Sequence, residues 1–145
     1  MVTAKTTPGA VLRLTSSRSD DGFIRARALS DSTIMITVFG DIDAASAEDL
    51  CDGIERHLGR HSQLVLDFSR VGFFGTAGFE VLSRLHARCQ RAGVDWVLVP
   101  GPEVARLLRI CDPNNVLRTA PNIVSAVAVL SRLPHRTSHL RAVAR

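Results

Sequence analysis

The chain has 145 residues, enough for one ordinary domain that buries roughly 68 to 70% of the surface exposed by its unfolded form. With 46% apolar and 22% charged residues it lies in the globular range, which excludes a disordered, collagen-like or disulfide-stapled polypeptide. No apolar run approaches the roughly 20 residues that span a bilayer, and the N-terminus lacks the apolar stretch of a secretory signal. We therefore expect a soluble cytoplasmic protein without membrane insertion.

The net charge of +4 comes from the two ends of the chain. Residues 1–19 contribute +3, residues 20–131 contribute −3 from 11 arginines and 14 acidic residues, and residues 132–145 contribute +4. A surface that binds the phosphate backbone of a nucleic acid needs basic side chains clustered on one folded face. The distribution instead predicts flexible basic segments at residues 1–21 and 134–145, around a single domain at residues 22–133. We expect no direct contact with nucleic acid.

The domain opens with two apolar segments, residues 22–29 and 33–39, which are separated by a short polar stretch that suits a hairpin turn. Residues 44–57 then carry apolar side chains at steps of three and four, which predicts a helix. The consecutive apolar residues within 63–68 are typical of a strand covered on both faces. This strand should therefore be central in a sheet.

Helical spacing returns over residues 76–92, and Gly93 stands where a helix often ends. Residues 96–99 predict another buried strand, and residues 116–119 a final short strand. Alternation of strand and helix predicts an α/β domain with a mixed, largely parallel sheet of four to five strands packed with four helices. The last two helices are marked by the apolar residues Val104, Leu107, Leu108 and Cys111, and Ile123, Ala126, Val127 and Leu130.

Patterns for catalysis or metal binding are missing from the sequence. Neither the phosphate-binding loop of nucleotide-hydrolysing enzymes nor the glycine pattern of dinucleotide-binding folds occurs. Cys51, Cys89 and Cys111 include no closely spaced pair, so we expect them to pack as small apolar side chains rather than to bind zinc. His57 and His61 lie four apart near an expected helix end, which is weak support for a metal site. We predict no cofactor and no metal.

The informative segment is residues 67–82, which reads DFSRVGFFGTAGFEVL. Glycines bracket two phenylalanines and Thr76 where the central strand gives way to a helix. Thr76 is thus placed at a helix N-terminus, where its hydroxyl either caps free backbone N–H groups or faces solvent. In the second case it can accept a phosphate, whose charge of about −1.5 to −2 is favoured by the helix dipole.

Two motifs, GDIDAA at residues 40–45 and DFSRVGFFGTAG at residues 67–78, resemble the STAS domain of anti-sigma factor antagonists, as does the order of elements over residues 22–131. The resemblance implies a non-enzymatic switch that binds an anti-sigma factor, usually a serine kinase with a GHKL-type ATPase fold, and thereby frees a sigma factor. In the family the kinase phosphorylates a serine or threonine in the loop before the second helix, which ends binding.

The family loop commonly reads Asp-Ser-Ser-Gly, and its first serine is the acceptor. In this chain the resemblance places the acceptor on Thr76 and the aspartate on Gly75. Asp43 matches a family aspartate near the switch, and its residue type also suits a helix N-cap. The partner-binding residues that the resemblance implies are Asp43, Ala44, Gly75, Thr76, Ala77, Gly78 and Phe79.

Two other interpretations remain open from the sequence. A Thr-Ala-Gly loop also resembles STAS subunits that bind the ATPase of lipid-transporting ABC systems, which makes such an ATPase the alternative partner. A more distant alternative is a small enzyme with a histidine and acid site around His86 and Glu80, although no motif supports it.

Overall fold

The computed structural model describes residues 24–134. Of the predicted flexible segments at residues 1–21 and 134–145, all but Pro134 lie outside this range, as do Gly22 and Phe23.

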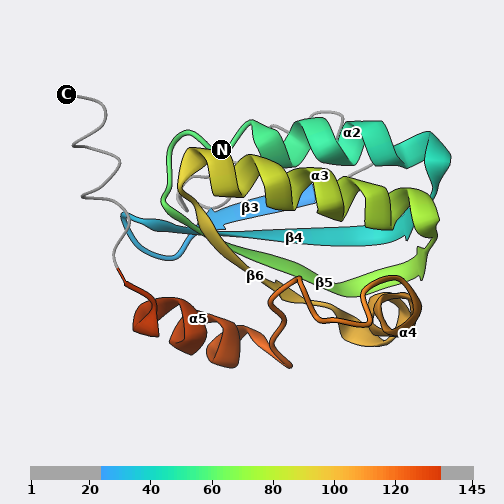
Figure 1. Ribbon diagram of the computed structural model, residues 1–145. Helices are drawn as coiled ribbons and strands as arrows, with labels where there is room; N and C mark the ends of the chain where they lie inside the picture. The colour runs from blue at the N-terminus through green and yellow to red at the C-terminus, as the bar shows by residue number, and fades with distance from the viewer. Residues whose placement is uncertain (1–23, 135–145) are drawn as a thin grey trace.

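A four-stranded mixed sheet forms the centre of the domain (Figure 1). Its order is β3 (Ile24–Ala28), β4 (Thr33–Ile42), β5 (Gln63–Phe74) and β6 (Asp95–Val99). β3 and β4 pair antiparallel as the predicted hairpin, whereas β5 pairs parallel with both β4 and β6. The predicted mixed, largely parallel sheet is confirmed, with β5 in a central position.

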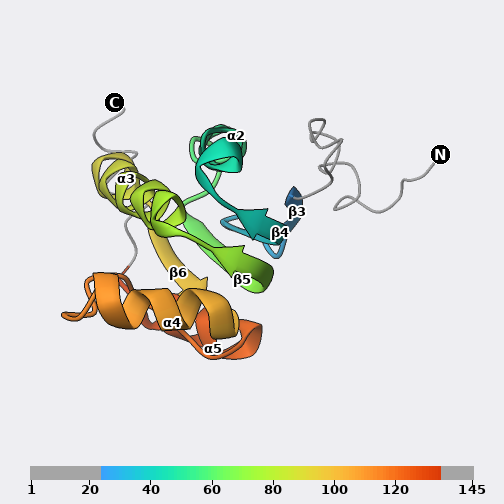
Figure 2. The ribbon, with the colours of Figure 1, turned by 90° about the vertical axis from the view of Figure 1, so that its right-hand side faces the viewer.

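Four helices cover the sheet on two sides, also as predicted (Figures 1 and 2). α2 (Ala44–Glu55) and α3 (Thr76–Ala92) lie side by side on one face of it. α4 (Gly101–Cys111) and α5 (Ile123–Arg132) lie on the other side, against β5 and β6. Among residues 24–134 no helix covers β3 or the end of β4 on this second side (Figure 2), and only Met35 near the start of β4 packs against the α5 cluster.

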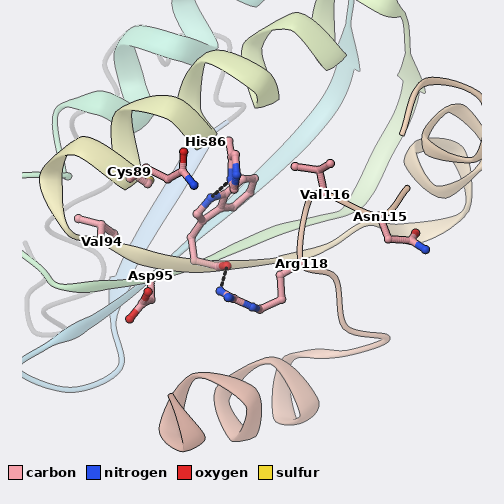
Figure 3. A pocket seen from close by; sticks show the side chains of 9 residues that line it. His86, Cys89, Val94, Asp95, Asn115, Val116 and Arg118 are labelled. Carbon is pink, nitrogen blue, oxygen red and sulfur yellow. Dashed lines mark hydrogen bonds between the residues drawn. The ribbon is translucent and has the colours of Figure 1, made fainter. Parts of the chain in front are cut away.

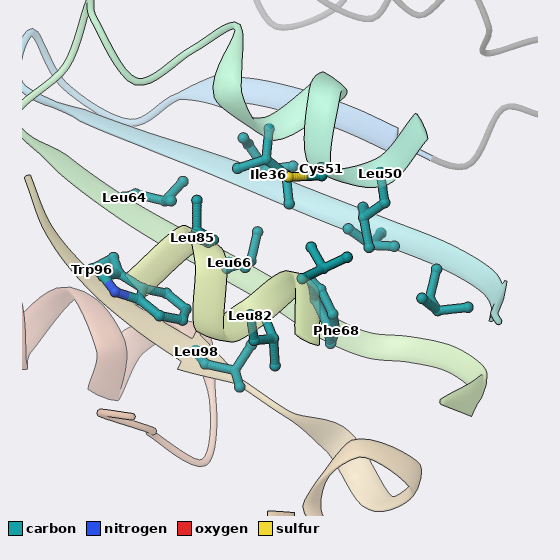
Figure 4. Close-up of a cluster of buried hydrophobic side chains, with 14 of the residues drawn as sticks. Ile36, Leu50, Cys51, Leu64, Leu66, Phe68, Leu82, Leu85, Trp96 and Leu98 are labelled. Atoms are coloured by element: carbon teal, nitrogen blue, oxygen red, sulfur yellow. The ribbon is translucent and has the colours of Figure 1, made fainter. Parts of the chain in front are cut away.

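The main hydrophobic core lies between the sheet and the pair α2 and α3 (Figure 4). Ile36, Leu66 and Phe68 from the strands meet Leu50 and Leu82 from the helices, and all five are fully buried. A second, smaller cluster lies between the sheet and α5, where Val65 and Val97 contact Ala126 and Leu130. Because β5 and β6 are covered on both faces, apolar residues follow one another along them without alternation.

The strands β4 and β5 extend further than the sequence pattern predicts, to Ile42 and Phe74 rather than to residues 39 and 68. Thr37 pairs with Asp67 but Phe39 pairs with Arg70, so β5 holds one extra residue there, and a second extra residue follows before Phe73. These bulges interrupt the alternation of buried and exposed positions. The pattern expected for a strand is therefore lost while the backbone pairing continues.

The predicted strand at residues 116–119 is wrong, because only a single bridge joins Thr119 to Leu98. The carboxylate of Asp112 accepts hydrogen bonds from the backbone N–H groups of Val116 (2.9 Å) and Leu117 (3.0 Å). These bonds hold the segment in a turn. Of its backbone groups, the Arg118 carbonyl and the Ala120 N–H form hydrogen bonds with Leu98 of β6. The Arg118 guanidinium also donates to the Trp96 carbonyl at 3.3 Å.

The expected core packing of the cysteines is confirmed for Cys51 and Cys89, whereas Cys111 is partly exposed. Burial raises the pKa of Cys51, and it raises the pKa of Cys89 to about 12. Both thiols are therefore protonated and unreactive at neutral pH. No group of three residues suited to holding a metal ion occurs within residues 24–134.

Candidate functional site

Two helices begin side by side at one edge of the sheet, directly after the strands β4 and β5. The last residues of these strands, Ile42 and Phe74, are register partners. The backbone N–H of Gly75 donates to the Ile42 carbonyl at 3.0 Å, so the strand pairing extends to the very start of α3. Asp43, directly after β4, and Thr76, two positions after the end of β5, are thus brought to the same surface, although 33 positions separate them in the sequence.

The start of α2 is closed by its own side chains. Asp43 Oδ1 accepts hydrogen bonds from the backbone N–H groups of Ala45 (3.0 Å) and Ser46 (3.1 Å). In return, Ser46 Oγ accepts from the Asp43 N–H at 3.1 Å, which completes a capping box. The N-cap interpretation of Asp43 is therefore confirmed, and its exposed carboxylate makes this corner of the surface negative. The sequence signal for the box is an aspartate followed three residues later by a hydroxyl side chain.

The start of α3, by contrast, has no side-chain cap. Its N-cap residue is Gly75, which has no side chain to cap the helix, and Thr76 is the first helical residue. Thr76 is exposed, and its hydroxyl forms no hydrogen bond within the described part of the chain. The interpretation of Thr76 as an N-cap is therefore wrong, and its side chain faces solvent. The N–H groups of Gly78 and Phe79 donate to the Gly75 carbonyl at 2.9 Å and 3.3 Å, which leaves those of Thr76 and Ala77 without an acceptor within the helix.

The three phenylalanines around this loop have different roles. Phe74 is buried in the main core, where its ring meets Phe68 edge to face at 5.6 Å between centroids. Phe79 packs partly buried against the same core, whereas Phe73 is 51% exposed. An exposed aromatic side chain of this size beside a polar hydroxyl is typical of a protein-binding surface.

Gly78 supports the loop from inside rather than contacting solvent. It is buried, and a Cβ atom on it would lie 2.8 Å from both Cδ1 and Cζ of Phe74. Of the implied partner-binding residues, Asp43, Ala44 and Thr76 are exposed, while Gly75, Ala77 and Phe79 are partly exposed. Gly78 thus lets the helix approach the strand end closely, and a partner cannot reach it directly.

The residues of the alternative enzymatic site do not come together. His86 lines a pocket of about 330 Å³ with Asp95, Asn115 and Arg118 (Figure 3). Its Nδ1 accepts a hydrogen bond from the Trp96 indole N–H at 3.2 Å. No hydrogen bond or ion pair connects His86 with the exposed Glu80 in residues 24–134, so the predicted pair of histidine and acid is absent there.

The fold and the position of these helix starts define an α/β domain whose candidate site is an exposed surface rather than a cavity. The family model of the STAS domain matches residues 26–126. Osmosensory protein A of Mycobacterium tuberculosis is 33% identical over 107 residues, which cover 73% of this chain and 68% of that protein. The chain belongs to the STAS domain family.

Solved structures of anti-sigma factor antagonists share the fold. Unphosphorylated SpoIIAA from Bacillus matches with a TM-score of 0.63 and 16% identity, over 77% of this chain and 99% of its own. An antagonist from Mycobacterium paratuberculosis matches with a TM-score of 0.64 and 21% identity, over 73% of this chain and 91% of its own. A putative antagonist from Thermotoga maritima matches with a TM-score of 0.68 and 14% identity, over 75% of this chain and 95% of its own. At these identities the likeness concerns the fold alone. Within residues 24–134, no helix combines the length and apolar character needed to cross a membrane.

Proposed function

We propose that this protein is an anti-sigma factor antagonist. It binds an anti-sigma factor through the loop between β5 and α3 together with the start of α2, and so releases a sigma factor. The observation that carries the proposal is the exposed hydroxyl of Thr76, unbonded at an uncapped helix start and beside the exposed Phe73. The fold shared with known antagonists supports it. In this function the protein acts by binding and catalyses no reaction itself.

Phosphorylation of Thr76 would control the binding. A kinase partner transfers the γ-phosphoryl group of ATP to the threonine oxygen, the hydroxyl proton passes to a base of the kinase, and ADP leaves. The fold tolerates the product because the first turn of α3 offers free N–H groups and the positive end of its dipole. The modification therefore changes the surface of the protein and leaves the core unchanged.

The same phosphate opposes partner binding. Neither residues 40–47 nor residues 71–80 contain a basic side chain, and the carboxylate of Asp43 stands at the neighbouring helix start. Setting an unpaired charge into a buried interface costs about 2 to 5 kcal/mol. Since each 1.4 kcal/mol is a factor of ten, the affinity falls by roughly thirtyfold to several thousandfold.

The test is affinity capture from the native cell with the full chain, comparing wild type, Thr76→Ser, Thr76→Ala and Thr76→Glu. We expect an anti-sigma factor to be recovered with the first three and lost with Thr76→Glu. Thr119→Glu is the matched control, since it places the same charge on an exposed threonine beside the edge strand β6, outside the candidate site. The purified chain with the captured kinase and ATP should gain one phosphate by mass, except in Thr76→Ala. Phosphate on another residue contradicts the acceptor assignment.

The second candidate partner is the ATPase of an ABC transporter. The Thr-Ala-Gly sequence of the loop, with Gly75 in place of the aspartate of typical antagonists, favours it. Recovery of an ABC ATPase in the same capture, without an anti-sigma factor, would replace the first proposal with this one. The effect of Thr76→Glu on that complex then tests whether the loop is the shared interface.

A further inference from the structure

One side of the sheet is left uncovered next to the loop that carries Thr76. In the part of the chain that the structure describes, no helix lies on this side of β3 and of β4 beyond Met35 (Figure 2). Ala26, Ile36 and Val38 point into the core on the other side, so their strand neighbours point here. We call this surface the open sheet face and define it by Arg25, Arg27, Phe39, Arg70 and Phe73.

Two of its arginines are held over one aromatic ring. The guanidinium carbon of Arg25 lies 5.0 Å from the centroid of the Phe39 ring, and that of Arg70 lies 5.8 Å from it. Such contacts orient a guanidinium group and leave its N–H donors unused. Among residues 24–134 no carboxylate forms an ion pair with Arg25, Arg27 or Arg70.

Acidic side chains nearby do not neutralise this cluster. Asp67 is the register partner of Thr37 on the same side of the sheet, but it is buried. Its Oδ1 accepts hydrogen bonds from the Ser69 N–H (3.0 Å) and Ser69 Oγ (2.6 Å). Asp41 lies further along, opposite Phe73. The open sheet face is therefore locally positive, although residues 20–131 together carry a charge of −3.

Protection of the sheet edge explains only part of this arrangement. Charged side chains on an edge strand discourage pairing with another chain, and Arg25 and Arg27 lie on the edge strand β3. Arg70 lies on β5, which is not an edge strand of the sheet, although its pairing with β6 ends at Asp67. The guanidinium of Arg70 lies over the Phe39 ring of β4 rather than along that unpaired stretch. A positive cluster that spans three strands therefore calls for another explanation.

The open sheet face is continuous with the candidate site. Phe73 follows Arg70 along β5, and a Cβ atom on Gly75 would lie 3.3 Å from its ring atom Cε2. The exposed ring therefore lies against Gly75, the residue before Thr76. A partner that covers the Thr76 loop and Phe73 would reach Phe39 and the arginines with its next few residues.

We propose that the open sheet face binds an acidic segment of the protein that docks at the Thr76 loop. The identity of this partner rests on the proposed function. Carboxylates of the segment bind the free guanidinium donors of Arg25, Arg27 and Arg70, and an apolar side chain of the partner covers Phe73. The terminal segments of the chain itself have the wrong net charge for this role, since residues 1–23 carry +1, with Asp20 and Asp21 as their only acids, and residues 135–145 carry +3.

Chemical crosslinking tests the contact directly. The only lysine of the chain is Lys5, so Lys5→Arg combined with Arg27→Lys leaves the introduced lysine as the only side-chain amine and preserves the charge. A carbodiimide then joins that amine to a carboxylate in direct contact. We expect a crosslink to an acidic segment of the purified partner identified by the capture above. Lys5→Arg with Arg88→Lys, at an exposed position on α3, is the matched control and should give none.

Charge reversal separates this inference from the proposed function. Arg25→Glu with Arg70→Glu should weaken the complex at least tenfold at low salt, and Arg88→Glu should change it less than twofold. If Thr76→Glu weakens the complex and the double reversal does not, the acidic contact is overturned and the proposed function stands. The opposite result keeps the contact and refutes control at Thr76. A homodimer in light scattering that the double reversal abolishes would overturn the proposal in favour of a second copy.

A titration that needs no partner completes the test. In amide NMR spectra, poly-L-glutamate should cause saturable shifts in β3, the end of β4 and the second half of β5. These shifts should disappear in the variant that combines Arg25→Glu and Arg70→Glu. Shifts confined to residues 1–23 and 135–145 would show that the charged ends alone attract an acidic chain, and would overturn the proposal.

Discussion

Adding a single methyl group at Gly78 should destabilise the protein, although alanine favours a helix more than glycine does. Gly78 lies in the first turn of α3 against the end of β5. In Gly78→Ala the new Cβ would lie 2.8 Å from Cδ1 and Cζ of Phe74. That ring cannot move away easily, because it is buried and packs edge to face on the fully buried Phe68.

The net effect follows from two opposing terms. Replacing glycine by alanine within a helix gains up to about 1 kcal/mol. Forcing an extra methyl group into a packed core costs typically about 1 to 3 kcal/mol. We expect Gly78→Ala to lower the free energy of unfolding by about 1 to 2 kcal/mol, since the first turn of a helix gains less than its interior.

The assay is urea unfolding followed by the fluorescence of Trp96, the only tryptophan, which is 4% exposed in the folded state. Gly59→Ala is the matched control, because a Cβ there meets no atom within 4 Å, and it should change stability by less than about 0.5 kcal/mol. Phe74→Leu removes the clashing ring atoms, so the double variant should be more stable than the sum of the single effects predicts. A Gly78→Ala protein as stable as wild type would refute the close-packing argument.

Two further predictions concern stability. Asp43→Ala should lower the free energy of unfolding by about 1 kcal/mol, because it removes the cap of α2. Asp49→Ala, at an exposed position of the same helix, should leave that free energy unchanged. Equal urea midpoints for the two variants would contradict the capping role. Burial lowers the pKa of His57 and of His61 below the ordinary 6.5, so the folded state binds protons less readily than the unfolded state. The free energy of unfolding should therefore be fully present above about pH 6.5 and fall as the pH drops through 6.5 towards the lowered values. His57→Leu should make this acid decline shallower in unfolding curves between about pH 5 and 8.

The order of strands and helices was predictable from the sequence because each element buries one face with its own period. The stripe Leu50, Cys51 and Ile54 of α2 and the consecutive apolar residues of β5 are both buried in the structure. The ends of the strands were not predictable in this way. Bulges at Arg70 and Phe73 break the alternation while the hydrogen-bonded ladder continues.

The candidate site was only partly accessible to sequence reasoning. Its position at a helix start followed from the glycines and Thr76, and the capping motif of Asp43 was legible as a pattern. Whether the Thr76 hydroxyl caps the helix or faces solvent depends on one residue of helix register, which local pattern does not determine. The arginines of the open sheet face were missed, although the alternation of Arg25 and Arg27 with Ala26 was a signal for one uncovered side of a strand.

By itself, the sequence determined the α/β class, the four helices, four of the five expected strands, and the position of a hydroxyl-bearing segment at a helix start, because these depend on the burial period and on residues close together in the chain. Only the tertiary structure decided that the starts of α2 and α3 meet at one edge, that Phe73 is exposed while Phe74 is buried, and that arginines from β3 and β5 share the ring of Phe39. These features arise from pairing between strands far apart in sequence, and the residue pattern of either strand alone does not show which strand it pairs with or in which register.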